Sequence, residues 1–310
     1  IHLTWVVEKP LRPLVEQHPA VDATVVVDTK SWRRAPLSSL TRSQVAVLRG
    51  RFRELAPDLC IDAQGVAKSA VIARWTGAPR RVGLARPWRR ERLAGLAYTE
   101  TIPGSGSHRH VVATNLELVR AVGHTSSVDV PTPDGRWLLK ACAGKSVQES
   151  WTRPFVVLLP GAGRRSKILP VQTLARVAKE VAGAGTEVAV AWGPGERERA
   201  AAISNEAGSG VHLAPPTDLQ ELAWLLGQSA MVIGGDTGPL HLAASFGVPT
   251  LGVFITTSWQ RNGPRGHKVR VISAVDDTDD RPSGSSHAPK VRSISAQEIV
   301  DAGIELLAES

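Results

Sequence analysis

The segment "MVIGGDTGPLHLAASFGVPTLGVF", from Met231 to Phe254, carries the clearest fold signal in the chain. An apolar run with strand character ends at two glycines, and Asp236, Thr237, Gly238 and His241 follow within seven residues. An apolar helical pattern comes next and leads into the short run "TLGVF". This order predicts a strand, a tight turn, a helix and a second strand, which is the repeating unit of a parallel α/β sheet.

The same alternation extends over the rest of the chain. The first half predicts strands over 2–7, 23–28, 58–64 and 80–85, and helices over 43–56, 66–78 and 112–123. The second half predicts strands over 155–160, 187–192, 210–215, 230–235 and 250–254, and helices over 171–185, 196–208, 217–229 and 295–308. The last helix but one opens with Thr217 and Gln220 in capping-box spacing.

Two α/β domains, each with a doubly wound parallel sheet, follow from this alternation. The segment from Ser126 to Thr152 breaks the rhythm, so we expect domains over residues 1–148 and 149–310. Ligands of such sheets bind at the carboxyl ends of the strands, and we expect them in a cleft between the two domains.

The composition is that of a globular protein, with 310 residues, 42% hydrophobic and 21% charged. No apolar run approaches the roughly 20 residues that a membrane-spanning helix needs. Cys60 and Cys142 lie far apart and in no metal or redox spacing, which is typical of a reducing cytoplasm. The chain begins at Ile1, and we expect the natural N-terminus to lie upstream.

The net charge of +8 is concentrated in one stretch, which has seven arginines and one glutamate between Arg74 and Arg92. An anionic partner and a merely solvated basic face both explain this pattern. Nucleic acid is the least favoured partner, because only Trp75 and Trp88 stand among these arginines and no nucleic-acid-binding module is recognisable.

The turn after residue 235 has the features of an anion site. Asp236 falls at the carboxyl end of a strand, Thr237 can cap the next helix, and Gly238 removes side-chain bulk where a ligand could approach. Free amides and the dipole at a helix start attract anions. His241, in the first turn, can face the same ligand. A capped helix with an incidental histidine is the alternative.

Two more strand ends add to this signal. Gly161 and Gly163 precede Lys167 after the first strand of the second half, so backbone amides and a cation can approach a phosphate there. Glu196 follows a Gly-Pro-Gly turn and can accept hydrogen bonds from ribose hydroxyls, or simply begin a helix. Together the three strand ends predict a nucleotide diphosphate site. The dinucleotide fingerprint fails, because Ser166 replaces its third glycine.

Five motifs occur together in one order: "DAQGVAKSAVIAR" (62–74), "RERLAGLAY" (90–98), "PGAGRRSK" (160–167), "WGPGERERA" (192–200) and the segment quoted first. With them the chain resembles the ADP-heptose:lipopolysaccharide heptosyltransferases of glycosyltransferase family 9, most closely type I. The resemblance implies a GT-B fold, with two Rossmann-like domains facing a cleft. It also implies inverting transfer of heptose from ADP-heptose to the Kdo sugar of lipid A, in lipopolysaccharide core synthesis.

The resemblance also implies roles for individual residues. The C-terminal domain would bind the donor, with Lys167 and Asp236 as catalytic residues and no metal or other cofactor. Donor contacts are implied for Gly163, Lys167, Glu196, Asp236, Thr237, Gly238 and His241. The N-terminal domain would bind the acceptor, a Kdo-lipid A or similar anionic glycolipid, through Lys68, Arg90 and Arg92.

The family resemblance implies a cytoplasmic protein, peripheral on the inner membrane. It places the general base in a loop after a first strand, which we expect upstream of Ile1, so that the chain as given binds donor without turnover. Two alternatives stay open. One is a related GT-B glycosyltransferase with another nucleotide sugar or acceptor, and the other is a non-catalytic protein that binds nucleotide sugars.

Overall fold

The computed structural model describes residues 1–86, 88–104, 110–123, 131–144, 154–275 and 291–309. Their contacts divide the chain into two compact units, Ile1–Pro131 and Thr132–Ser310. The predicted domain boundary after residue 148 lies in the segment 145–153, outside the described residues. Helix α5 (Arg136–Ala141) belongs to the second unit, since it packs against α8 (Leu219–Gln228).

The second unit is built on a six-stranded sheet with the order β11-β10-β9-β6-β7-β8. All of its strand pairings are parallel, as the alternation predicts. The central strands β6, β9 and β10 are buried along their whole length, which suits a parallel sheet covered on both faces. The six strands are β6 (Phe155–Leu159), β7 (Glu187–Val190), β8 (Val211–Leu213), β9 (Met231–Gly234), β10 (Thr250–Phe254) and β11 (Val269–Ser273).

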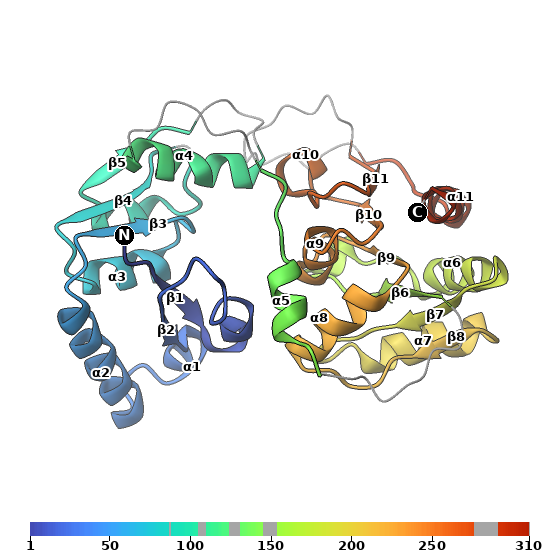
Figure 1. Cartoon of the computed structure of the whole chain (residues 1–310), viewed down its shortest axis with the longest axis horizontal. Coiled ribbons are helices and arrows are strands. Elements are labelled where there is room, and N and C mark those ends of the chain that lie inside the picture. Colours follow the sequence, from blue (N-terminus) through green and yellow to red (C-terminus); the bar gives the residue numbers. More distant parts are fainter. Residues whose placement is uncertain (87, 105–109, 124–130, 145–153, 276–290, 310) are drawn as a thin grey trace. The chain divides into compact units, whose positions relative to one another are not determined.

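Helices cover both faces of this sheet (Figure 1). On one face α6 (Val171–Gly183) packs against α7 (Arg197–Ala207) and α11 (Ala296–Ala308). On the other face α8 packs against α9 (Gly238–Ser245) and α5. The short helices η3 (Arg165–Lys167) and α10 (Trp259–Asn262) follow β6 and β10. The unit is therefore doubly wound, as predicted.

The described residues of the first unit form five parallel strands in two sheets, β1-β2 and β3-β4-β5. Val25 of β2, Phe52 of α2 and Ile72 of α3 belong to one hydrophobic core, which packs helices α2 and α3 with the β1-β2 sheet. The strands are β1 (Thr4–Glu8), β2 (Ala23–Val27), β3 (Leu59–Asp62), β4 (Arg80–Leu84) and β5 (Glu100–Ile102). The helices are η1 (Lys9–Leu14), α1 (Thr29–Arg34), α2 (Ser39–Leu55), α3 (Ala67–Trp75), η2 (Arg92–Ala97) and α4 (Val111–Gly123).

The capping box predicted for α8 is wrong by one residue. Asp218 is the N-cap, and its carboxylate accepts from the amides of Gln220 and Glu221. Oε2 of Glu221 accepts from the amide of Asp218 in return, at 2.6 Å. Aspartate caps a helix at least as well as threonine, and Glu221 stands three residues beyond Asp218, as a capping box requires.

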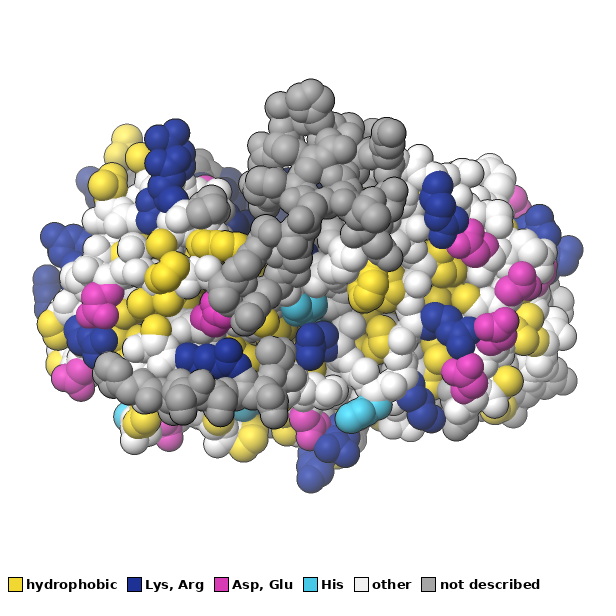
Figure 2. Space-filling model, turned by 90° about the horizontal axis from the view of Figure 1, so that it is seen from above, with side chains coloured by type: hydrophobic (Ala, Val, Ile, Leu, Met, Phe, Trp, Pro, Cys, Tyr) yellow, Lys and Arg dark blue, Asp and Glu magenta, His cyan; other side chains and the backbone are white. Residues whose placement is uncertain are grey.

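Acidic and basic side chains are interleaved over the face of the second unit that Figure 2 shows. Arg270 pairs with Glu305 and Glu309, and Arg292 pairs with Glu298. Exposed pairs of this kind contribute little to stability.

No helix in the described part of the chain is both long and apolar enough to cross a bilayer.

Candidate active site

The candidate site lies where the strand order of the second unit reverses. The chain proceeds from β6 outward to β7 and β8, then returns to β9 on the other side of β6 and continues to β10 and β11. Strands β6 and β9 are therefore neighbours whose following loops diverge, and such a point is where open α/β sheets bind ligands. The three strand ends that the sequence singles out follow β6, β7 and β9, which are adjacent in the sheet.

Lys167 and Asp236 meet across this point. Nζ of Lys167 donates to Oδ2 of Asp236 at 2.6 Å, and both side chains are largely buried, at 18% and 15% exposure. Lys167 ends η3, where its amide donates to the carbonyl of Arg164. The residues predicted as the catalytic pair thus lie in direct contact, although 69 positions separate them in the sequence.

Two further side chains surround the carboxylate of Asp236. Nε2 of His241 lies 3.8 Å from Oδ1, which is too long for a hydrogen bond, while the hydroxyl of Thr257 donates to Oδ2 at 3.1 Å. His241 and Lys167 lower the pKa of Asp236 to about 2, against the opposing effect of burial. Asp236 is therefore ionised at neutral pH, and it neutralises much of the charge of Lys167.

The start of α9 has unused hydrogen-bonding capacity. Thr237 is the N-cap residue as predicted, but its side chain makes no capping bond. Its hydroxyl oxygen is buried without a hydrogen-bond partner among the described residues. A Cβ on Gly238 would meet no atom within 4 Å, so packing within the protein does not require this glycine. A hydroxyl and first-turn amides are thus available to an anion at the helix start.

Glu196 reaches from the loop after β7 toward the loop after β6. Its Oε2 accepts from the amide of Gly193 at 2.9 Å. A Cβ on Gly161 would lie 1.9 Å from its Oε1, so the carboxylate occupies the space that a side chain at 161 would need. Gly163 is exposed, with nothing within 4 Å of its Cβ direction. The packing of Glu196 therefore accounts for Gly161, whereas no contact within the described residues accounts for Gly163.

Arg199 and Thr257 are part of this arrangement and were not among the predicted residues. Nε of Arg199 donates to the carbonyl of Pro160 at 3.1 Å, and its Nη2 donates to the carbonyl of Leu169. Burial lowers the pKa of Arg199, while the nearby charge of Glu196 opposes this shift. The sequence contained one signal for Thr257, which is its position after a predicted strand. That strand, β10, is the neighbour of β9 in the sheet, so the segments that follow the two strands start at the same edge.

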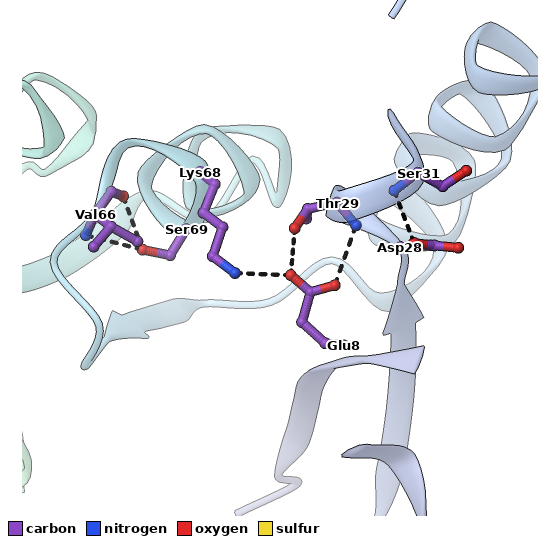
Figure 3. A network of polar contacts seen from close by, with 7 residues as sticks. All are labelled: Glu8, Asp28, Thr29, Ser31, Val66, Lys68 and Ser69. Atoms are coloured by element: carbon purple, nitrogen blue, oxygen red, sulfur yellow. Dashed lines mark hydrogen bonds and ion pairs between the residues drawn. The ribbon is translucent and has the colours of Figure 1, made fainter. Parts of the chain in front are cut away.

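In the first unit, Lys68 lies in a polar network at the ends of three strands (Figure 3). Nζ of Lys68 donates to Oε1 of Glu8 at 2.8 Å, and Glu8 also accepts from the amide and the hydroxyl of Thr29. Glu8 ends β1, Thr29 follows β2 and Lys68 follows β3. Burial raises the pKa of Glu8, but the bonds from Lys68 and Thr29 outweigh this effect, so the pKa is lowered overall.

A second network holds the loop before α3. Asp62 is only 6% exposed and accepts from the amides of Gln64 and Gly65, from Oγ of Ser69 and from the hydroxyl of Tyr98. Burial and the bond to Asp62 raise the pKa of Tyr98. Four donors on one carboxylate fix the loop that leads into α3, the helix whose first turn carries Lys68.

Arg90 and Arg92, predicted as acceptor contacts with Lys68, are exposed. The residue between them connects their segment to the Lys68 helix: the amide of Glu91 donates to the carbonyl of Gly65, and its Oε2 accepts from the amide of Ala67. The three predicted acceptor residues thus lie on two segments that are bonded to each other.

The chain belongs to glycosyltransferase family 9 (heptosyltransferase), whose family model matches residues 45–288. The lipopolysaccharide heptosyltransferase 1 of Pseudomonas aeruginosa is 29% identical over 259 residues, which are 83% of this chain and 71% of the relative. The enzyme of the same name from Escherichia coli K12 is 26% identical over 276 residues, 88% of this chain and 84% of the relative. The predicted family, and with it a glycosyltransferase, is confirmed.

Solved structures show the same fold. The E. coli heptosyltransferase WaaC with ADP has a TM-score of 0.80 at 23% identity, covering 99% of this chain and 90% of WaaC. WaaC with ADP-2-deoxy-2-fluoro heptose has a TM-score of 0.77 at 25% identity, covering 98% and 90%. The predicted GT-B fold class is confirmed.

Proposed function

We propose that this protein is an inverting glycosyltransferase that transfers heptose from ADP-heptose to the Kdo sugar of lipid A. The observation that carries the proposal is the contact of Lys167 with Asp236 beside the start of α9. A cation, a carboxylate and free helix amides there suit a sugar joined to a diphosphate. The WaaC structures with ADP and a fluorinated ADP-heptose support the choice of donor.

In this proposal the diphosphate binds the amides of Thr237 and Gly238, and Lys167 turns from Asp236 to the phosphate oxygens. When a Kdo hydroxyl attacks the anomeric carbon of the heptose and gives its proton to a general base, the bond between sugar and phosphate breaks and leaves negative charge on ADP. Lys167 and the dipole of α9 stabilise that charge without a metal ion, which is electrostatic stabilisation of the leaving group. Asp236, released from Lys167, accepts hydrogen bonds from the heptose.

The remaining donor contacts are to the ribose and to the diphosphate or the sugar. Glu196 is held by the amide of Gly193 with Oε1 directed at the loop after β6, where it can accept from ribose hydroxyls. His241, 3.8 Å from Asp236, stands close enough to contact the diphosphate or the sugar.

On the acceptor side, Lys68, Arg90 and Arg92 bind the anionic groups of a Kdo-lipid A or similar glycolipid. Lys68 then exchanges Glu8 for an acceptor carboxylate or phosphate, as Lys167 exchanges Asp236 for the donor. A lipid acceptor requires the protein to work as a peripheral protein on the cytoplasmic face of the inner membrane.

Calorimetric titration with ADP, UDP and GDP in the presence of a chelator tests the donor site. Selective binding of ADP is expected, and it supports both the adenine nucleotide and the independence from metal. Selective UDP or GDP binding would keep the fold and overturn the heptose donor. Failure of a folded chain to bind any of the three would contradict the proposed site.

A further inference from the structure

In the short helix η2 the large apolar side chains are exposed and the small ones are buried. Leu93 and Leu96 are 71% and 84% exposed, whereas Ala94 is 0% and Ala97 9% exposed. In a 3₁₀ helix, residues three apart lie one above the other. The two leucines therefore share one outward face, and the two alanines share the inward face.

Packing prevents the leucines from turning inward. Ala94 and Ala97 form a small core with Ala70 of α3, and Tyr98 packs against it. The guanidinium of Arg89 lies against Gly95, where a Cβ would come within 2.1 Å of its Nη1. Close approach of η2 to α3 thus depends on small residues, and there is no room for a leucine on that side.

Exposed basic residues precede the two leucines in the sequence. Arg86, Arg90 and Arg92 are exposed on the same stretch. The one acidic residue among them, Glu91, directs Oε2 to the amide of Ala67 at the start of α3. The stretch therefore presents two exposed leucines together with three exposed arginines and one exposed glutamate, Glu91, whose Oε2 is bonded to the start of α3.

We propose that η2 docks this protein on an anionic phospholipid bilayer, with Leu93 and Leu96 entering the interface and Arg90 and Arg92 contacting headgroups. Apolar area and attraction to anionic lipid together determine the affinity of such surfaces. The inference rests on the proposed function only in one respect: a lipid-borne acceptor must reach the loop of Lys68, to which η2 is joined through Glu91.

Flotation with vesicles of phosphatidylcholine alone, or with about one third phosphatidylglycerol, tests the docking without any acceptor. The wild-type chain is expected on the anionic vesicles only. The double variant Leu93→Ser/Leu96→Ser should lose about tenfold in partitioning at every salt concentration, because the loss is apolar. Arg90→Gln/Arg92→Gln should lose about tenfold at low salt and less at high salt, because the loss is electrostatic.

A matched control is the variant Leu37→Ser/Leu40→Ser. These leucines have the same spacing, are 84% and 64% exposed, and lie in the same unit. Unchanged flotation of this control supports η2 as the docking element. Equal loss in the control, no loss in the η2 leucine variant, or no binding of the wild-type chain overturns the proposal.

ADP affinity, measured on the same samples, separates this inference from the proposed function. The η2 leucine variant should bind ADP like the wild type, because the donor site lies in the other unit. Its circular dichroism spectrum should also match that of the wild type, which shows that it is folded. If ADP fails to bind any of the proteins while the flotation differences persist, the donor site is wrong and the docking surface stands.

Discussion

Nζ of Lys167 and Oδ2 of Asp236 lie 2.6 Å apart, across the two neighbouring strands at which the sheet order reverses. The charge of Lys167 is therefore already paired in the protein without ligand. In the function we propose, donor binding replaces the Asp236 carboxylate by the diphosphate as the anionic partner of Lys167, so the measured affinity would reflect the difference between the two contacts.

Replacing Lys167 by alanine is expected to weaken ADP binding by about tenfold or more, because a charge-assisted contact to the diphosphate is lost. Titration calorimetry gives the affinity directly. Lys179→Ala is the matched control, since this lysine is exposed on α6 of the same unit. Equal affinities of the two variants would remove Lys167 from the phosphate site.

Gly161→Ala is expected to weaken ADP binding to the same extent as Glu196→Ala, by about fivefold. The new Cβ would displace the Glu196 carboxylate, which otherwise lies 1.9 Å from it. The double variant should be no weaker than either single variant, because both act through one carboxylate. Gly183→Ala, where nothing lies within 4 Å, should bind ADP normally. Additive losses would show that Gly161 acts independently.

Asp236 should make stability depend on pH in acid. Its pKa of about 2 lies below the ordinary value near 4, so the unfolded chain binds more protons between these values. The stabilisation is complete above about pH 4 and is lost as the pH falls toward 2. Urea unfolding gives the free energy of unfolding of the wild type and of Asp236→Asn. The difference in favour of the wild type should decrease by about 1 kcal/mol between pH 5 and pH 3. A constant difference would contradict the lowered pKa.

Tyr98 is the only tyrosine of the chain, so the absorbance change that accompanies tyrosine ionisation at alkaline pH comes from this residue. Its raised pKa predicts no phenolate in the folded protein near pH 10, where an ordinary tyrosine is half ionised. Ionisation should accompany alkaline unfolding, because above about pH 10 the unfolded chain gives up the proton more readily. Titration near pH 10 with the circular dichroism unchanged would rule out the buried bond to Asp62.

Long periodic segments made the architecture predictable. The strand predicted over 250–254 is β10 itself, and the helix predicted over 171–185 differs from α6 only at its end. Short elements such as β5 and η2 were not predicted, since three to six residues carry too little periodicity. The division of the first unit into two sheets also depends on pairing between distant strands, which no local pattern encodes.

The candidate site was predictable where a residue follows a strand directly. Asp236 and Lys167 were found because the turns after β9 and β6 contain unusual polar residues between apolar runs. Partners from elsewhere in the chain were not found. Glu8 lies 60 positions from Lys68, and Arg199 is one of four charged residues in the run from Glu196 to Arg199. Only the tertiary structure distinguishes such residues from a solvated face.

Arg199 holds the carbonyl groups of Pro160 and Leu169, at the two ends of the loop that contains Lys167. The side chain comes from α7, whose N-cap residue is Glu196, the glutamate proposed for the ribose. Arg199 thus ties the loop after β6 to α7. A chimaera in which only the β6 loop is exchanged, in order to change donor specificity, would leave the ends of that loop unsupported. Engineering a new donor preference here requires transplanting the loop and α7 together.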